Sequence, residues 1–191
     1  MIVTLAKNQV KALLACAAKN DVRYYLNSIL IDNSGDNGCI VVATDGHVLL
    51  AGEPTKTEYP EYGKWIVPRD ILELSLKTKA KDFFIEVGAS QAGSINNLPF
   101  TCIAGIFPDW RQVLSDATEH VPSDTAYQFD PDLMSVAHTA AIQFSGMDKA
   151  PGILARVSKD GSQLYYHAPS CFALVAGLNA KKLADCARIP V

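Results

Sequence analysis

The chain has 191 residues, of which 49% are hydrophobic and 19% are charged, and its formal net charge is −3 at pH 7. This composition is typical of an ordinary globular protein and excludes an intrinsically disordered chain. No apolar run approaches the roughly 18 to 20 residues of a membrane span, and the N-terminus lacks the layout of a signal peptide, so we expect a cytoplasmic protein without a membrane partner.

The cysteines and histidines predict no metal site. The five cysteines are widely spaced among apolar neighbours, and the four histidines add no ligand at short spacing. Zinc sites use clustered Cys and His ligands, so we expect reduced core thiols and no cofactor. The cysteines are Cys16, Cys39, Cys102, Cys171 and Cys186.

The N-terminal segment predicts a strand, a helix and three further strands. Ile2 to Leu5 is the first strand, and apolar spacing predicts a helix over Lys7 to Lys19. Two strands follow at Tyr25 to Asp32 and Cys39 to Thr44. Asp45-Gly46 then predicts a hairpin in which both turn residues have a positive φ. The buried helix face consists of Val10, Leu13, Leu14 and Ala17.

The same order of elements recurs in the next segment. Trp65-Ile66-Val67 predicts a strand, and Pro68 is suited to the first turn of a helix. The buried face of that helix consists of Ile71, Leu72 and Leu76. The three strands that follow are predicted at Asp82 to Val87, Ser94 to Asn97 and Leu98 to Ala104.

A third copy begins with a predicted strand at Tyr127 to Phe129. Asp130 and Pro131 are then a cap and a first-turn residue, and the apolar helix face consists of Leu133, Met134, Ala137, Ala141 and Phe144. Its strands are predicted at Ile153 to Ser158, Gln163 to His167 and Cys171 to Leu178, with turns at Asp160-Gly161 and Pro169. The helix starts are separated by about 61 and 63 residues, which indicates an internal repeat.

Three motifs occur in the order that they have in a known family. They are Asp21-Val22-Arg23-Tyr24-Tyr25-Leu26-Asn27, Ala43-Thr44-Asp45-Gly46-His47 and Ile106-Phe107-Pro108-Asp109-Trp110-Arg111. The segment that holds them resembles the second domain of the bacterial DNA polymerase III beta subunit, the replicative sliding clamp. The resemblance implies an α+β fold, the DNA-clamp or processivity fold, with about three βαβββ units in this chain.

The resemblance also implies a domain organisation. Residues 1–115 would form a complete clamp-like domain of two units, residues 126–178 a third unit or half domain, and residues 179–191 a tail. The polar segment Ser115 to Thr125 predicts the linker. A bacterial clamp subunit has six such units, so we interpret the chain as a shortened member, of phage, plasmid or chromosomal origin. Its unpaired third unit would make it a homo-oligomer, with four chains closing a twelve-unit ring or with two chains sharing the half domain.

The family's approach to DNA suggests the first set of site residues. The loop before the paired tyrosines implicates Asn20, Arg23, Tyr24 and Tyr25, and the helix faces add Lys7, Lys11, Arg69 and Lys77. Cations would meet phosphates and phenols would stack or hydrogen-bond, so binding to double-stranded DNA would be non-specific. The alternatives are that Tyr25 is packed within a strand and that the helix charges are a solvated face. The net charge of −3 does not decide, because a sliding ring needs only weak attraction.

A hydrophobic groove is the family's second functional surface, and it receives short peptide motifs from polymerases and repair proteins. The matching positions are Leu26, Thr44, Gly46, His47, Leu49, Pro108 and Val113. The chain departs from the family at Val48 and Gln112, where arginine is common, and it lacks the family's C-terminal tail strand, although Arg188-Ile189-Pro190-Val191 could line the groove. The alternative is that Leu26 and Leu49 are core residues and Gly46 is a turn glycine.

These motifs imply a sliding-clamp-like processivity factor in DNA replication, which encircles or cradles DNA and tethers polymerase or repair proteins. The alternative is a clamp-derived adaptor or decoy that binds clamp-binding peptides without encircling DNA. We expect no enzyme, because Asp45 and His47 flank a turn, and the sequence has no nucleophile elbow or phosphate-cradling glycine loop.

Overall fold

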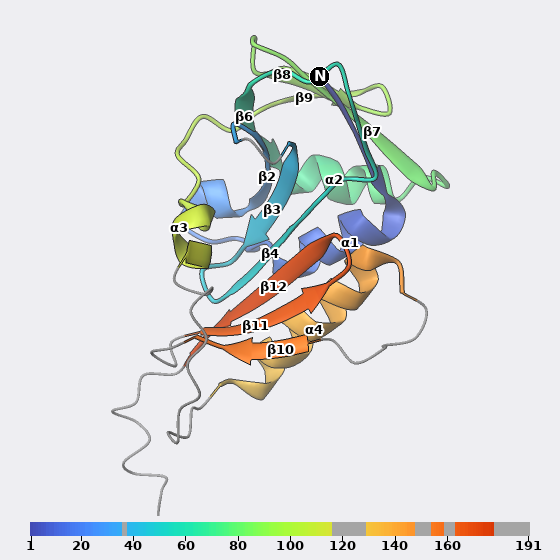
Figure 1. Ribbon diagram of the computed structural model, residues 1–191. Helices are drawn as coiled ribbons and strands as arrows, with labels where there is room; N and C mark the ends of the chain where they lie inside the picture. Colours follow the sequence, from blue (N-terminus) through green and yellow to red (C-terminus); the bar gives the residue numbers. More distant parts are fainter. Residues whose placement is uncertain (36–37, 116–128, 148–153, 159–162, 178–191) are drawn as a thin grey trace, which may run out of the picture.

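The computed structural model describes residues 1–35, 38–115, 129–147, 154–158, 163–177. Two antiparallel sheets lie in front of three helices, α2, α1 and α4, with α1 packed against both of the others (Figure 1). None of the helices in these ranges is long and apolar enough to cross a membrane. The predicted α+β fold is confirmed by this arrangement.

The elements follow the predicted order of three units. The first unit has β1 (Ile2–Ala6), α1 (Lys7–Cys16), the 3-10 turn η1 (Tyr24–Leu26), β2 (Ser28–Asn33), β3 (Ile40–Thr44) and β4 (Val48–Gly52). After β5 (Lys56–Glu58), the second has β6 (Gly63–Pro68), α2 (Arg69–Leu76), β7 (Asp82–Val87), β8 (Ala92–Ile95) and β9 (Leu98–Thr101). After α3 (Trp110–Ser115), the third has α4 (Pro131–Ser145), β10 (Leu154–Val157), β11 (Gln163–Ala168) and β12 (Cys171–Ala176).

The first two units exchange their first strands. The five-stranded sheet has the order β5-β1-β7-β8-β9, so β1 of the first unit lies on the outer edge of β7 of the second. The seven-stranded sheet has the order β10-β11-β12-β4-β3-β2-β6, so β6 of the second unit lies on the outer edge of β2 of the first. Each of the two sheets therefore includes a strand from the other unit.

The third unit joins the first rather than the second. Strand β12 runs antiparallel to β4, with Leu174 opposite Leu49. Two bonds reinforce this seam: Asn8 Nδ2 donates to the Gln143 carbonyl (2.7 Å), and Glu53 N donates to the Ser170 carbonyl (2.9 Å). The seven-stranded sheet is thus continuous across two units that lie far apart in the sequence.

Strand β4 is buried on both faces, which divides the core in two. Val48 and Leu50 face the helices, whereas Leu49 and Ala51 face a second apolar cluster on the outer side of the sheet. We call this second set the outer cluster, and its buried members are Leu30, Val42, Leu49, Ala51, Ile66, Phe107, Trp110, Tyr165 and Leu174. The segment that follows β9 therefore covers the outer face of the seven-stranded sheet.

Several local predictions differ from the structure. Tyr25 lies in the η1 turn, and the strand begins at Ser28. Of Asp45-Gly46 only Gly46 has a positive φ, of 95°, because the Asp45 carboxylate itself organises the turn by accepting from the His47 and Val48 amides. Pro68 precedes α2 as its N-cap instead of occupying the first turn. Strand β5 and helix α3 were not predicted from the sequence.

Other expected elements are confirmed or lie outside the described residues. Asp130 caps α4 through its side chain, Pro131 is the first helical residue, and the helix ends at Gly146 with φ 70°. Strand β7 has the predicted bounds. Tyr127, Asp160-Gly161 and residues 116–128 and 179–191 lie outside the described residues, as does Cys186.

The described cysteines are free and buried, as expected. Burial raises the pKa of Cys39 to about 11 and that of Cys171 to about 12, so both thiols are protonated at neutral pH. Within the ranges given above, no group of three His, Cys, Asp or Glu side chains could hold a metal ion.

Substituting Gly52 by alanine is expected to lower the free energy of unfolding by about 1 to 2 kcal/mol, because overpacking forces neighbours to shift. A Cβ atom at this end of β4 would lie 2.7 Å from Cys171 Cβ and 2.8 Å from the Ser170 carbonyl oxygen. Urea unfolding measures the change, with Gly88→Ala as the control, since a Cβ there meets no atom within 4 Å. Equal stability of the two variants would contradict close packing at the seam.

Candidate nucleic-acid and peptide surfaces

The loop before η1 is braced by its own side chains. Asp21 N donates to Asn27 Oδ1 (2.9 Å), and Asn27 Nδ2 donates back to the Asp21 carbonyl (2.8 Å). Arg23 Nη2 lies 2.7 Å from Asp21 Oδ2, and the hydrogen bonds from Arg23 lower the pKa of Asp21 to about 2. The loop therefore presents a guanidinium that is held in place while its side chain remains 47% exposed.

Arg23 also connects the first two motifs of the sequence. Its Nη2 donates to the Asp45 carbonyl (3.2 Å), and a Cβ at Gly46 would lie 3.0 Å from Nη1. Glycine at this turn therefore leaves room for the guanidinium as well as adopting a positive φ. Asn20, at the start of the same loop, is exposed with φ 60°.

The paired tyrosines have different environments. Tyr24 is 56% exposed and its hydroxyl donates to the Ala104 carbonyl (3.0 Å). Tyr25 is half-buried, meets Tyr24 edge to face at 5.8 Å, and packs against the outer cluster. Tyr24 can offer a ring face to a ligand, whereas Tyr25 agrees with the alternative of a packed side chain.

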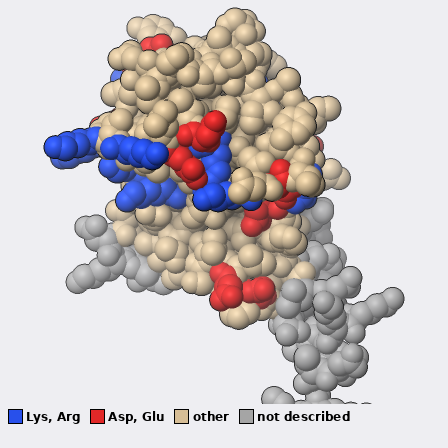
Figure 2. Space-filling view, turned by 180° about the vertical axis from the view of Figure 1, so that it is seen from behind, with Lys and Arg blue, Asp and Glu red and all other residues tan. Residues whose placement is uncertain are grey.

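Lysines gather on the helix side of the molecule. Figure 2 shows Lys and Arg in a band across the middle of the face opposite to that of Figure 1, with acidic groups beside them. Lys7 Nζ donates to the Thr78 carbonyl (3.3 Å), which places the segment after α2 next to the start of α1. The exposed lysines of these two elements are Lys11, Lys77, Lys79 and Lys81. Lys7, Lys11 and Lys77 were among the predicted site residues. Lys79 and Lys81 were not, although the Lys-Thr-Lys-Ala-Lys run is a signal for them in the sequence.

Arg69 has a structural role that the sequence did not reveal. Its Nη1 donates to the carbonyls of Leu14 (2.8 Å), Ala17 (2.9 Å) and Ala18 (3.3 Å), so it caps the C-terminal end of α1. Its Nε pairs with Glu73 at 2.7 Å, and the side chain is only 17% exposed. The expectation that Arg69 is a free cation of a DNA-facing surface is therefore corrected.

Glu73 carries a negative charge within the basic band. The hydrogen bond from Arg69 lowers its pKa, and the charges of Lys19 and Lys77 act in the same direction. On α4 the only charged residue is Asp132, which is exposed near Ser135 and Thr139. The positive charge is thus concentrated on α1 and the end of α2 and does not continue across α4.

The predicted peptide-groove residues fall into two groups. Leu26, Thr44 and Leu49 are buried, so the structure supports the alternative that Leu26 and Leu49 are core residues. The Thr44 hydroxyl donates to the Val48 carbonyl and accepts from the Gly46 amide, which stabilises the turn. The exposed positions are Gly46, His47 and Pro108, and Val113 is half-buried against the outer cluster. Leu49 and Val113 therefore meet in one cluster, of which Gly46 and His47 are not members.

A buried carboxylate holds the segment after β9 on the sheet. Asp32, at 0% exposure, accepts from Trp110 Nε1 (2.9 Å), the Ser34 hydroxyl (2.6 Å) and Arg111 Nη1. The Arg111 guanidinium stacks over the Trp110 ring at 4.4 Å. We call Asp32, Ser34, Trp110 and Arg111 the Asp32 network. Trp110 and Arg111 belong to the third sequence motif, whereas no motif contains Asp32.

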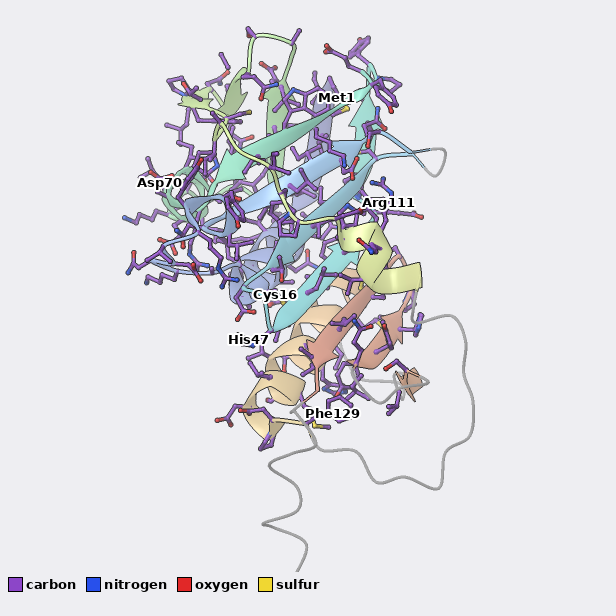
Figure 3. The ribbon with its side chains drawn as sticks, turned by 90° about the vertical axis from the view of Figure 1, so that its left-hand side faces the viewer. Met1, Cys16, His47, Asp70, Arg111 and Phe129 are labelled. Carbon is purple, nitrogen blue, oxygen red and sulfur yellow. The ribbon has the colours of Figure 1, made fainter. Side chains whose placement is uncertain are left out.

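A hollow of about 550 Å³ lies beside this network. Its apolar lining includes Leu30, Ile66 and Phe107, and its polar lining includes Lys64, Gln91 and Thr101. Ile106, also in the lining, is 88% exposed. Figure 3 shows Arg111 and His47 at different ends of the seven-stranded sheet, so this hollow is distinct from the turn at His47.

The Asp32 network predicts a specific dependence of stability on pH. Burial alone would raise the pKa of Asp32, but hydrogen bonds from Ser34, Arg111 and Trp110 outweigh it and the pKa is lowered. A lowered pKa contributes stability that is present above the unfolded value of about 3.9 and is lost as pH falls through the folded value. We expect the difference in unfolding free energy between wild type and Asp32→Asn to be constant from pH 7 to 5 and to shrink below pH 4. A difference that grows on acidification would contradict this.

The comparisons with known proteins point to one family. The beta sliding clamp of Escherichia coli strain K12 is 30% identical over 114 residues, which are 56% of this chain and 31% of that protein. The beta sliding clamp of Buchnera aphidicola is 30% identical over 136 residues, 68% of this chain and 37% of that protein. The chain therefore spans about a third of the length of these curated relatives. No family model matches the chain.

The fold itself is shared with solved structures. The DNA polymerase III subunit beta of Pseudomonas aeruginosa matches with a TM-score of 0.63 over 94% of this chain and 66% of that chain. The sequence identity in that comparison is 17%, so it shows the fold alone.

Proposed function

Because this chain is a relative of the bacterial beta sliding clamps that spans part of their length, we propose that it is a sliding-clamp-like processivity factor. In this role it encircles or cradles DNA, tethers polymerase or repair proteins, acts in the cytoplasm and catalyses no reaction. The observation that carries the proposal is the edge-to-edge joining of β4 and β12, which places three helices side by side with lysines on one helix face.

DNA contact is assigned to the basic band and the Arg23 loop. The proposed residues are Lys7, Lys11, Lys77, Lys79, Lys81, Asn20, Arg23 and Tyr24. Such contacts are non-specific and salt-dependent, because each cation that meets a phosphate releases a counterion. Weak contacts suit a protein that must slide along the duplex.

Peptide tethering is assigned to the surface between the His47 turn and the outer cluster. Extended peptides gain affinity by placing a few apolar side chains in a groove, while backbone groups set the register. The proposed groove residues that remain accessible are Gly46, His47, Pro108 and Val113, above the buried Leu49. Polymerase or repair proteins with short apolar motifs are the proposed partners.

Self-association completes the proposal. The chain would form a homo-oligomer, with four chains in a closed ring and two chains as the alternative. The ring would retain DNA by topology, so tight phosphate contacts are not required.

The test is retention of the full chain on nicked circular DNA and on the same DNA after linearisation, over a series of salt concentrations. We expect longer retention on the circle, and a salt slope reduced by roughly 2 in the double variant Lys79→Glu/Lys81→Glu, since each lost phosphate contact lowers the slope by about 1. Lys56→Glu is the control, because Lys56 already pairs with Glu58 on β5. Equal retention on both DNA forms would reject encirclement.

An adaptor or decoy that binds clamp-binding peptides without encircling DNA is the second candidate. Two observations favour it: α4 contributes no lysine or arginine to the helix face, and the Arg69 guanidinium is occupied by α1. Binding of an apolar peptide, lost in His47→Glu but unaccompanied by DNA retention, would support this candidate over the first.

A further inference from the structure

We propose that the hollow beside the Asp32 network is a binding site for a small amphipathic carboxylate, a molecule with an apolar body and one anionic end. Its carboxylate would meet Lys64 and the backbone amide of Ile66. Its apolar body would lie on Leu30, Ile66 and Phe107. The site goes beyond the proposed function and does not depend on it, because it uses none of the residues assigned to DNA or to peptides.

The size and the walls of the hollow suit a molecule of this kind. Its volume of about 550 Å³ falls within the roughly 300 to 1,000 Å³ that small-molecule sites occupy. Leu30 and Ile66 are opposite each other on β2 and β6 and belong to the outer cluster. The segment from Thr101 to Phe107 forms the facing wall. The apolar part of the site is thus bounded by a sheet face and by the segment that follows β9.

The hollow has a surplus of positive charge. Among the described residues of its lining, Lys64 is the one charged side chain. Lys64 Nζ lies 3.8 Å from Asp32 Oδ2, but the same oxygen already accepts from Arg111 Nη1. Two cations therefore share one carboxylate, which leaves one positive charge for an anionic ligand.

The Lys64 ammonium can reach a ligand without breaking a buried hydrogen bond. Its side chain is 51% exposed, and the separation of 3.8 Å from Asp32 is too long for a hydrogen bond. An ammonium has three donors, and none of them is used by an acceptor among the described residues. A ligand carboxylate would accept a charge-assisted hydrogen bond from this group, which is stronger than a neutral one.

The edge of β6 adds a backbone donor. Arg69 N donates to the Asn27 carbonyl (3.1 Å), and hydrogen-bonded pairs alternate along an antiparallel ladder. Ile66, opposite Leu30, therefore points its amide and carbonyl away from β2. Its carbonyl accepts from Ile103 N (2.8 Å), but no acceptor for its amide lies among the described residues. Ile66 is only 5% exposed, so a ligand carboxylate would pair a donor that is otherwise buried without a partner.

The strand register orients the ligand. Residues two apart in a strand point to the same face, so Lys64 lies next to Ile66 over the outer face of the sheet. A carboxylate at Lys64 places the apolar body over Ile66 and Leu30. A neutral molecule of the same shape would make the apolar contacts but not the charged one, so the anionic end is what the site selects.

The experiment is a titration of the isotope-labelled full chain with octanoate and, separately, with octanol, followed by the amide signals in two-dimensional NMR spectra. We expect octanoate to bind saturably with a dissociation constant between about 10 μM and 1 mM, and to shift the signals of Lys64, Ile66 and Ile103. Octanol, which has the same chain without the charge, should bind roughly 10-fold more weakly.

Two lysine variants test the charged contact. In Lys64→Gln the dissociation constant of octanoate should rise roughly 10-fold while that of octanol stays unchanged. Lys56→Gln, which removes an exposed lysine on β5, should match wild type. Ala104→Trp tests the location: Ala104 is an exposed residue of the lining, so a large ring there should fill the hollow and abolish the binding of both molecules.

Circular dichroism confirms that each variant is folded. Equal affinity for octanoate and octanol, or an unchanged octanoate affinity in Lys64→Gln, would overturn the assignment of the anionic end. Absence of saturable shifts at the lining residues, or binding that persists in Ala104→Trp, would overturn the site itself.

Discussion

Replacing Asp32 by alanine is expected to lower the free energy of unfolding by about 3 kcal/mol, the largest effect that we predict for a polar residue. The substitution removes the acceptor of Trp110 Nε1 and the partner of the Arg111 guanidinium. When one partner of a buried ion pair is removed, the polar or charged group of the other partner stays buried without a partner. The free-energy cost of that unpaired group exceeds the net stabilisation that the intact pair provides. Because the Arg111 side chain is 35% exposed, its guanidinium can be hydrated in the variant. The loss in unfolding free energy is therefore expected at the lower end of the range for removing one partner of a buried ion pair.

Urea unfolding followed by tryptophan fluorescence measures this change, since Trp110 reports on the same segment. The control is Asp109→Ala, because Asp109 is exposed and accepts only the Arg111 amide among the bonds that the structure shows. We expect the control to change stability by less than about 0.5 kcal/mol. If the two variants were equally stable, the Asp32 network would not be what fixes the segment after β9.

Substituting Arg69 by alanine is expected to cost about 2 kcal/mol and to fray the end of α1. Three carbonyl oxygens lose their donor, and the last carbonyls of a helix have no partner within the helix itself. Glu73 also loses the charge that lowers its pKa. Hydrogen exchange of the Leu13 to Ala18 amides, together with urea unfolding, would locate and measure the effect.

Lys77→Ala is the matched control, because it removes a cation from the other end of α2, where the cap is made by the Lys77 backbone and is retained in the variant. Arg69→Lys separates charge from geometry: a single ammonium group cannot reproduce the planar fork of donors, so we expect it to recover less than half of the loss. Full recovery by lysine would show that charge alone stabilises α1.

The repeat of βαβββ units could be predicted because each has strong local signals. Asp130 and Pro131 define the start of α4, and the alternation of Asp82 to Val87 defines β7 with its observed bounds. The joining of β12 to β4 could not be predicted, because strand pairing between distant segments depends on which edges remain free after the first two units have formed.

The candidate site was predictable to a smaller extent. Arg23 and Tyr24 lie at the surface as expected, but Arg69 looked like an exposed helix cation because the three carbonyls that it caps belong to another helix. Asp32 looked like the end of a strand, and its partners follow 78 and 79 residues later. Long-range polar partners leave no periodic pattern in a sequence.

Pro99 has a consequence for the two sheets as templates for further strands. It lies in β9, the last strand of the five-stranded sheet, in the position opposite Ser94 of β8. Proline has no amide proton, so an extended segment laid along the outer edge of β9 would lose a hydrogen bond there. Growth of the five-stranded sheet by strand addition is therefore disfavoured at this edge.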